Sequence, residues 1–279
     1  MEKLFTFYRY GEKGDWFTHT NFFNILRLAG YQSIWLSNQE GFGVYSRAGR
    51  FYARQGDIKK FAMAKDSTTL VVSYDGRLLP MLDETLNHAG EGGKTFYVLH
   101  LMGTHSSYIM RYPKEYDKIS SMSEGGFKGI SEQQKRIKAE YDNAVLYNDF
   151  IVDEIIRRFE NRNAVVIYIS DHGEEVYDTR DYAGHDEING NRYMIEIPML
   201  IWTSKQFQAV YPDLCQRIAI SVNRPFMTDD MIHVLLDLMD IETEEYDPAK
   251  SVINKAFDIS RKRIYGGKIY DKQHGLQKM

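Results

Sequence analysis

The chain has 279 residues, of which 43% are hydrophobic and 14% aromatic, so it can bury a sizeable core and disorder is not expected. Its formal net charge of −4, with no block of like charges, provides no long-range attraction to polyanions and disfavours a nucleic-acid partner. The single cysteine, Cys215, excludes an intrachain disulfide and cysteine-rich zinc modules, so a metal would need histidine and carboxylate ligands.

The first predicted element is a short helix over residues 20–30. Thr20 has a hydroxyl that can cap the helix, and Phe23 and Leu26 contribute to an apolar face. Gly30 can close the helix in the left-handed conformation, which strains glycine little. We therefore expect a helix that is capped by Thr20 and closed by Gly30.

Apolar runs predict strands at residues 31–37, 69–74, 96–102, 164–170 and 197–202. Most of these runs are continuously apolar rather than alternating, which is typical of strands buried on both faces, as in a parallel sheet. Between them lie helical patterns, of which the longest, residues 131–161, is expected to pack one face on the sheet.

The alternation of strands and helices predicts an α/β fold: a three-layer α/β/α sandwich with a mostly parallel sheet, in a single domain over residues 1–279. Ligand sites in such folds lie at the carboxyl ends of the strands. No run of about 18 apolar residues is present, and no apolar signal-peptide segment follows Met1. The sequence therefore predicts a soluble chain without a signal or transmembrane segment.

A candidate metal turn follows the apolar run that ends at Ser170. Asp171 and His172 come next, and Gly173 permits a sharp turn that lets both side chains face one cavity. A carboxylate oxygen beside an imidazole nitrogen suits zinc or manganese. The alternative interpretation is that Asp171 caps a helix beginning at Gly173 while His172 only completes the loop.

Two further histidines have comparable positions. His105 lies just beyond the predicted strand over residues 96–102, and His185 stands 13 positions after His172 and can return to the same cavity. A lone histidine is more often structural than functional. Three histidines at matching topological positions instead indicate a common site.

Other polar residues near these turns have two interpretations each. Glu174 and Glu175 can orient a metal ligand or can complement the charge of a helix N-terminus. Arg111 and Lys114 can bind an anionic group of a substrate or can be solvated loop charges. His100 lies inside a predicted strand and is interpreted as a packed core histidine.

A combination of motifs extends over nearly the whole chain, in segments 26–39, 99–105, 141–149, 170–174 and 197–202. Together these segments resemble the phosphoethanolamine transferases, a family of the alkaline phosphatase and sulfatase superfamily that modifies lipopolysaccharide or lipid A. Segment 170–174, Ser-Asp-His-Gly-Glu, is specific by itself, whereas the others are specific only in combination.

The resemblance implies that Asp171 and His172 are zinc ligands, with manganese or another divalent metal as the alternative. It implies that His105 and His185 contact the transferred phosphate or a second metal. The chemistry it implies passes through a phospho-threonine intermediate, with a phospholipid, usually phosphatidylethanolamine, as donor and lipopolysaccharide or lipid A as acceptor. The full-length family member places this domain at the periplasmic face of the inner membrane.

The sequence departs from the family on its N-terminal side. In the family, a strand ending in a glutamate ligand and then the threonine nucleophile precede the segment that resembles residues 4–8, and membrane helices precede both. Here Thr6, Thr18 and Thr20 are interpreted as strand, loop and capping residues, so no catalytic nucleophile is assigned. We therefore expect an N-terminally incomplete domain, inactive by itself and without the membrane domain, that associates through an exposed sheet edge.

Two alternative functions remain. A sulfate or phosphate ester hydrolase of the same superfamily is disfavoured, because Cys215 stands in Leu-Cys-Gln-Arg and lacks the proline of the sulfatase nucleophile motif. The other alternative is an inactive remnant that acts as a binding module for a phosphorylated ligand or a partner.

Overall fold

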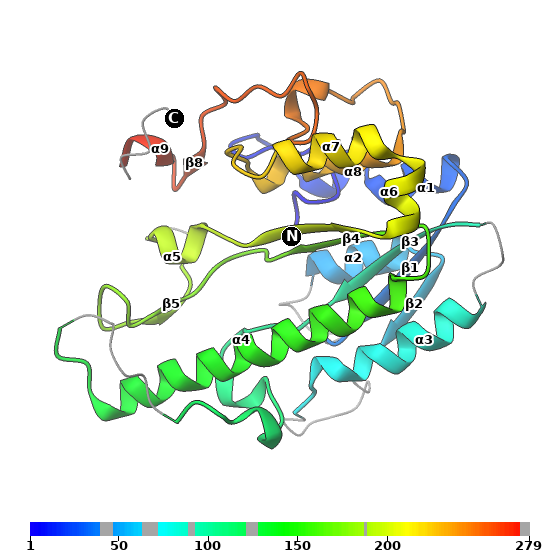
Figure 1. Ribbon diagram of the computed structural model, residues 1–279. Helices are drawn as coiled ribbons and strands as arrows, with labels where there is room; N and C mark the ends of the chain where they lie inside the picture. The colour runs from blue at the N-terminus through cyan, green and yellow to red at the C-terminus, as the bar shows by residue number, and fades with distance from the viewer. Residues whose placement is uncertain (40–46, 63–71, 89–92, 121–127, 187–188, 274–279) are drawn as a thin grey trace. The chain divides into compact units, whose positions relative to one another are not determined.

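The computed structural model describes residues 1–39, 47–62, 72–88, 93–120, 128–186 and 189–273 (Figure 1). The chain divides into two compact units. Unit 1 comprises Met1–Gly30, Phe159–Asp171 and Glu187–Met279, and unit 2 comprises Tyr31–Arg158 and His172–Asp186. Of the helices within the described ranges, none combines the length and apolar character that a bilayer crossing requires.

A three-stranded parallel sheet forms the centre of unit 2. Its order is β2–β1–β3, with β1 at Tyr31–Ser37, β2 at Ile58–Phe61 and β3 at Lys94–His100. The central strand β1 pairs with both neighbours in parallel. Trp35 and Leu36 of this strand are fully buried. The strands predicted over residues 31–37 and 96–102 are confirmed, whereas β2 had no prediction.

Three helices belong mainly to unit 2: α2 at Arg47–Gln55, α3 at Leu78–His88 and α4 at Glu132–Phe159. Helix α3 packs on β1, and its buried side chains Leu78, Leu82 and Leu86 recur every fourth residue, as a single buried helix face requires. A short hairpin, β5 at Glu175–Val176 and β6 at Ala183–Gly184, completes the regular structure of this unit.

Helix α4 confirms the helix predicted over residues 131–161 and is the long green helix of Figure 1. It begins at a reciprocal capping pair, because Gln134 N donates to Ser131 Oγ while Ser131 N donates to Gln134 Oε1. Near its other end, Arg158 Nε donates to Asp83 of α3 at 2.8 Å. The capping pair stabilises the start of α4, and the Arg158 contact attaches α4 to α3.

Unit 1 contains most of the short helices and an antiparallel strand pair. Strand β4 (Val165–Ile169) confirms the strand predicted over residues 164–170, and β7 (Met199–Thr203) largely confirms the one over 197–202. The two pair antiparallel, with Val165 opposite Thr203. This pair therefore departs from the parallel arrangement that continuous apolar runs predicted, because such runs report burial and do not encode strand direction.

The remaining elements of unit 1 are α1 (Phe22–Leu28), α5 (Arg192–Ile195), α6 (Lys205–Val210), α7 (Pro212–Ile220), α8 (Met231–Met239), β8 (Ile264–Tyr265), β9 (Lys268–Ile269) and α9 (Tyr270–Gln273). Short 3₁₀ turns occur at Trp16–Thr18, Asp75–Arg77, Tyr108–Met110, Lys114–Tyr116, Thr228–Asp230 and Pro248–Lys250.

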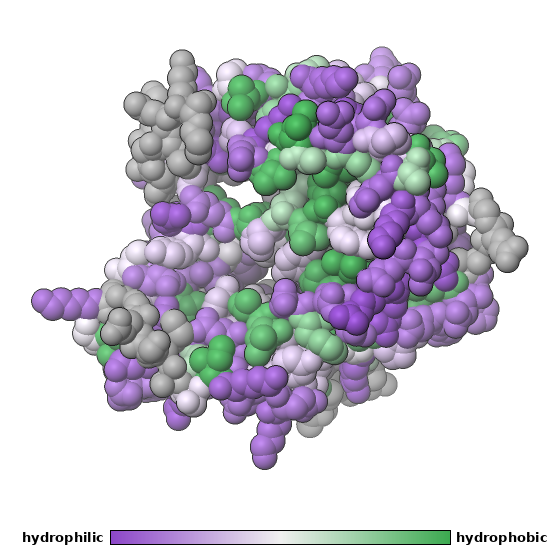
Figure 2. Space-filling model, in the orientation of Figure 1, coloured by the Kyte–Doolittle hydropathy of each residue, from purple (hydrophilic) through white to green (hydrophobic). Residues whose placement is uncertain are grey.

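On the face seen in Figure 2, hydrophobic residues lie in small groups among hydrophilic ones. Such mixing is usual for protein surfaces.

The predicted cap of α1 was one residue off. Asn21 is the N-cap, and its side chain accepts a hydrogen bond from Asn24 N at 3.2 Å, so Thr20 does not cap the helix. An asparagine caps better than a threonine, and it stands one position closer to the first helical residue. At the other end, Gly30 has the left-handed conformation that was predicted, with φ of +77°.

The strand predicted over residues 69–74 is not confirmed. Residues 69–71 lie outside the described ranges, and residues 72–74 form no strand. A short apolar run does not by itself distinguish a strand from other conformations.

Two buried aspartates lie directly before the first residue of helix α8 in unit 1. Asp229 and Asp230, 3% and 1% exposed, both accept hydrogen bonds from the Arg261 guanidinium, and burial raises the pKa of Asp230 to about 6. Nearby in the chain, burial lowers the pKa of His233 to about 4. The backbone N–H of Asp247 donates to His233 Nδ1, which requires a lone pair on that nitrogen.

We expect Leu36→Ala to lower the free energy of unfolding by about 2–5 kcal/mol, because it leaves a cavity at a fully buried position of the central strand. The matched control is Leu28→Ala on α1, where the side chain is 90% exposed and the change should stay within about 0.5 kcal/mol. Urea unfolding followed by circular dichroism measures both values. Equal effects of the two substitutions would contradict the placement of Leu36.

A second prediction concerns acid stability. The folded-state pKa of His233, about 4, lies below its ordinary value of 6.5, so the unfolded chain binds more protons between these values and stability falls as the pH is lowered from 6.5 to 4. His233→Asn keeps an acceptor for Asp247 N and removes the titration. The loss of unfolding free energy over this window should shrink by up to about 3 kcal/mol in the variant. Curves of unfolding free energy against pH that run parallel for the wild type and His233→Asn would contradict the lowered pKa of His233.

Candidate metal centre

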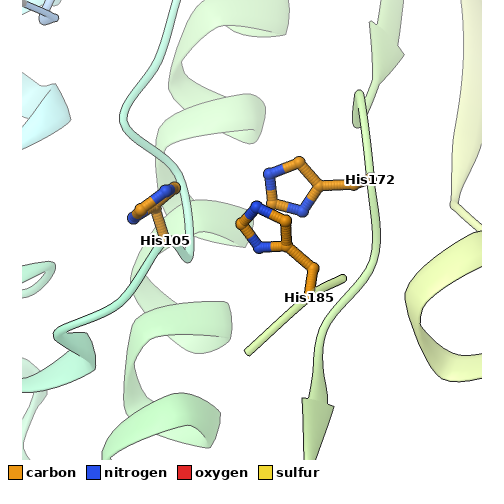
Figure 3. A group of neighbouring side chains, drawn as sticks. All are labelled: His105, His172 and His185. Carbon is orange, nitrogen blue, oxygen red and sulfur yellow. The ribbon is translucent and has the colours of Figure 1, made fainter. Parts of the chain in front are cut away.

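Three histidines from separate turns converge in unit 2. His105 follows β3, His172 follows β4, and His185 follows β6. One ring nitrogen of each lies within 4.8 Å of the others. Figure 3 shows the rings of His172 and His185 lying against one another, with centroids 3.6 Å apart, and the ring of His105 facing them from its own loop. The structure thus brings together the three histidines that the sequence predicted to share a cavity.

Hydrogen bonds determine which ring nitrogen of each histidine carries the proton. His105 Nδ1 lies 2.8 Å from the carbonyl oxygen of the next residue, and His172 Nδ1 lies 3.1 Å from the equivalent oxygen. His185 Nδ1 lies 2.8 Å from Glu174 Oε1. Carbonyl and carboxylate oxygens accept hydrogen bonds, so Nδ1 is the donor in all three rings and the lone pair of each neutral ring is on Nε2.

The His105 turn is held by side chains on both of its sides. Asp75, which is 4% exposed, accepts hydrogen bonds from the backbone N–H groups of Met102 and Gly103, both at 2.8 Å. Burial raises the pKa of Asp75, and its hydrogen bonds, including one from Asn38, act against that rise. Gly103 has a φ of +59°, so the turn uses a conformation that other residues rarely adopt.

Arg111 has a structural role on the other side of this turn. Its Nε donates to the carbonyl oxygen of His105 at 2.7 Å, and its Nη2 donates to the carbonyl of the following residue at 3.2 Å. The sequence predicted either an anion-binding residue or a solvated charge at this position. The structure shows that the guanidinium contacts the backbone that carries His105.

Glu174 connects two parts of the site. Its carboxylate is nearly fully buried; Oε1 accepts from His185 and Oε2 accepts from the Tyr108 hydroxyl at 2.7 Å. Burial and this bond to Glu174 raise the pKa of Tyr108 well above its usual value. Of the two interpretations of Glu174, the structure supports the partner that orients a histidine. Tyr108 itself had no signal in the sequence.

The hairpin β5–β6 explains how His185 returns to His172. Its strands pair Glu175 with Gly184, and Lys138 of α4 donates to Val176 O at 2.6 Å and to Asp178 at 2.7 Å. Glu175 is fully buried and forms an ion pair with Arg180 within the hairpin. The hairpin also excludes the helix that was the alternative at residue 173.

Asp171 was predicted to be a metal ligand beside His172. It follows β4 at the end of unit 1, is exposed, and is absent from the group of possible metal ligands in the described part of the chain. Its role as a ligand therefore stays a prediction. His100 is half-buried, with its ring packed against Trp35 and its Nδ1 3.2 Å from Ser37 Oγ, which agrees with the packed histidine that was predicted.

The three histidines suit a divalent metal. Each presents an imidazole whose lone pair is on Nε2 and whose Nδ1 is bound to an oxygen, the arrangement that metal-ligating histidines adopt. Nitrogen donors of this kind fit zinc and leave open positions for substrate when only three are present. The group therefore fits zinc, the metal that the sequence predicted, although the sequence had assigned that metal to Asp171 and His172.

Comparison with known proteins is consistent with this chemistry. The family model described as Sulfatase matches residues 2–241. The chain is 33% identical to phosphoethanolamine transferase EptC of Escherichia coli K12 over 262 residues, which cover 92% of this chain and 44% of that protein. It is also 33% identical to phosphoethanolamine transferase CptA of Salmonella typhimurium, over 87% of this chain and 42% of that protein. The chain thus spans less than half the length of these relatives.

Solved structures of phosphoethanolamine transferases also resemble this chain. The crystal structure of the C-terminal periplasmic domain of E. coli EptC in complex with Zn is 31% identical, with a TM-score of 0.85 over 99% of this chain and 80% of that one. The integral membrane protein EptA of Neisseria meningitidis shares the fold, with a TM-score of 0.67 at 23% identity over 90% of this chain and 47% of that one. The chain therefore belongs to the sulfatase family of the alkaline phosphatase superfamily and is related to the periplasmic domains of phosphoethanolamine transferases.

Proposed function

We propose that this chain is the catalytic domain of a metal-dependent phosphoethanolamine transferase that acts on lipopolysaccharide or lipid A. The observation that carries the proposal is the convergence of His105, His172 and His185, each with its lone pair on Nε2, in a chain of this family. Relatives at 33% identity bear the name of this activity. A phospholipid, usually phosphatidylethanolamine, is the proposed donor.

We assign the following roles to residues of the chain. His172, together with Asp171, would hold zinc, while His105 and His185 would contact the transferred phosphoryl group or hold a second metal. A bound zinc ion supplies Lewis acidity, which stabilises negative charge and lowers the pKa of a nearby hydroxyl. The histidines themselves present nitrogen lone pairs, and their Nδ1 bonds prevent the rings from rotating away.

The proposed reaction proceeds in two displacements. A threonine hydroxyl attacks phosphorus, the bond from phosphorus to the glycerol oxygen breaks, and diacylglycerol leaves with the proton that the hydroxyl gives up. An oxygen of the acceptor then attacks the phospho-threonine, takes the phosphoethanolamine group and releases the threonine. We assign no residue of this chain as that nucleophile. Glu174 and Asp75 take no part in bond making; they hold His185 and the His105 turn at fixed positions.

Fold and location complete the proposal. We propose one domain with a three-layer α/β/α sandwich, in which the site lies at the carboxyl ends of the strands. We also propose that the domain works at the periplasmic face of the inner membrane. The solved structures described as the periplasmic domain of EptC and as an integral membrane EptA support this location.

The metal assignment predicts the effect of removing a ligand. His172→Ala should lower the affinity for Zn²⁺ by more than about 100-fold, because removing even an outer partner of a ligand costs 10- to 100-fold. His88→Ala is the matched control, since His88 is the exposed last residue of helix α3 and its ring contacts the backbone of Glu84 in the same helix. Titration calorimetry with a competing chelator measures both. Equal zinc affinities of the wild type and His172→Ala would contradict the assignment.

The transfer reaction predicts a chemical change in cells. With the gene at its own locus, the wild type should add phosphoethanolamine to lipopolysaccharide, and His172→Ala should reduce that adduct by at least about 100-fold, as loss of a ligand predicts. Mass spectrometry of extracted lipopolysaccharide measures the adduct, and His88→Ala should leave it unchanged. Release of phosphate or phosphoethanolamine to water without an adduct would support the hydrolase instead. No turnover of any ester by the wild type would support the binding module.

A further inference from the structure

Tyr108 is a buried residue that reaches the histidine cluster through one carboxylate. Only 3% of it is exposed, and its hydroxyl lies 2.7 Å from Glu174 Oε2. The other oxygen of Glu174 lies 2.8 Å from His185 Nδ1 and 3.7 Å from His172 Nδ1. Two different donors therefore hold the two oxygens of a single buried carboxylate.

The ring of Tyr108 is itself fixed in place. It belongs to the 3₁₀ turn Tyr108–Met110, three positions after His105, and its ring meets the ring of Tyr141 on α4 edge-on at a centroid distance of 5.1 Å. The loop that supplies His105 thus also supplies the hydroxyl that reaches Glu174. Figure 3 shows the histidines that these contacts serve, with His185 beside His172 and opposite His105.

We propose that Tyr108 is a positioning residue for the histidine cluster. Its hydroxyl fixes the rotation of the Glu174 carboxylate, and the carboxylate then fixes the ring orientation of His185 and the proton on Nδ1. A charge-assisted bond in a dry interior is strong and directional, so releasing one oxygen frees the whole carboxylate to turn. The role of the histidine cluster in catalysis rests on the proposed function. The hydrogen bonds from Tyr108 to Glu174 and from His185 to Glu174 do not.

Tyr112 provides a matched control within the same loop. It is also 3% exposed, and its hydroxyl lies 3.5 Å from Asp117, on the side of Asn143 and α4 rather than Glu174. Tyr108→Phe and Tyr112→Phe both remove one buried hydroxyl. They differ in that only the first breaks a link to Glu174.

The experiment uses the full 279-residue chain without metal. Nitrogen-15 NMR of the histidine rings, at a pH where they are neutral, should show His185 protonated on Nδ1 in the wild type and in Tyr112→Phe. In Tyr108→Phe it should show a mixture of the two ring forms. Zn²⁺ affinity should fall about three- to tenfold in Tyr108→Phe, less than the 10- to 100-fold typical of a direct partner of a ligand, and should not change in Tyr112→Phe.

Unchanged His185 signals and unchanged zinc affinity in Tyr108→Phe would overturn the proposal. If that variant does not fold, proton NMR of the wild type tests the proposal instead. The Tyr108 hydroxyl proton should exchange slowly with water and lie close to Glu174. A proton that exchanges rapidly and does not lie close to Glu174 would overturn the proposal equally. If the wild-type chain binds no zinc, the proposed metal-dependent function is contradicted. The ring signals of His185 would still test the role of Tyr108 in that case.

Discussion

Burying a carboxylate is costly unless donors surround it, and this constraint organises the candidate site. Asp75 and Glu174 are both buried in unit 2. Asp75 accepts from Asn38 and from the backbone of Met102 and Gly103, so it must lie where the turn after β3 begins. Because the turn supplies the donors that the carboxylate needs, the buried charge and the loop conformation stabilise one another.

Glu174 applies the same constraint to the other histidines. Its two oxygens accept from His185 and from Tyr108, which come from segments far apart in the chain. A neutral histidine that donates through Nδ1 has its lone pair on Nε2, the form in which imidazole binds a metal. The buried carboxylate therefore contributes both to the packing of unit 2 and to the chemical form of the site. The hairpin β5–β6, anchored by Lys138, keeps His185 within its reach.

The family relationship and the site geometry support one another without being the same observation. Similarity to the zinc complex of the EptC periplasmic domain covers nearly all of the chain and shows the fold. The hydrogen bonds of the three histidines are a property of this chain's own side chains, and they fit a metal independently of that similarity. The carboxylate at Asp171 belongs to unit 1, whereas the histidines belong to unit 2.

Sequence by itself determined the elements whose signals are local. The strand over residues 31–37 and the helix over 131–161 were predicted because continuous apolar runs and helical periodicity depend on neighbouring residues alone. The sequence also singled out His105 and His172, because each follows a recognisable apolar run, and His185 by its spacing from His172. The specific motif Ser-Asp-His-Gly-Glu also identified the family, which the comparisons confirmed.

Only the tertiary structure decided the rest. The antiparallel pairing of β4 with β7 and the roles of Asp75 and Tyr108 depend on partners distant in sequence. Strand direction and hydrogen-bond partners are set when segments meet, and residue type alone does not encode them. Buried polar residues must find donors or acceptors wherever the fold provides them, so their roles become visible only once the chain has folded.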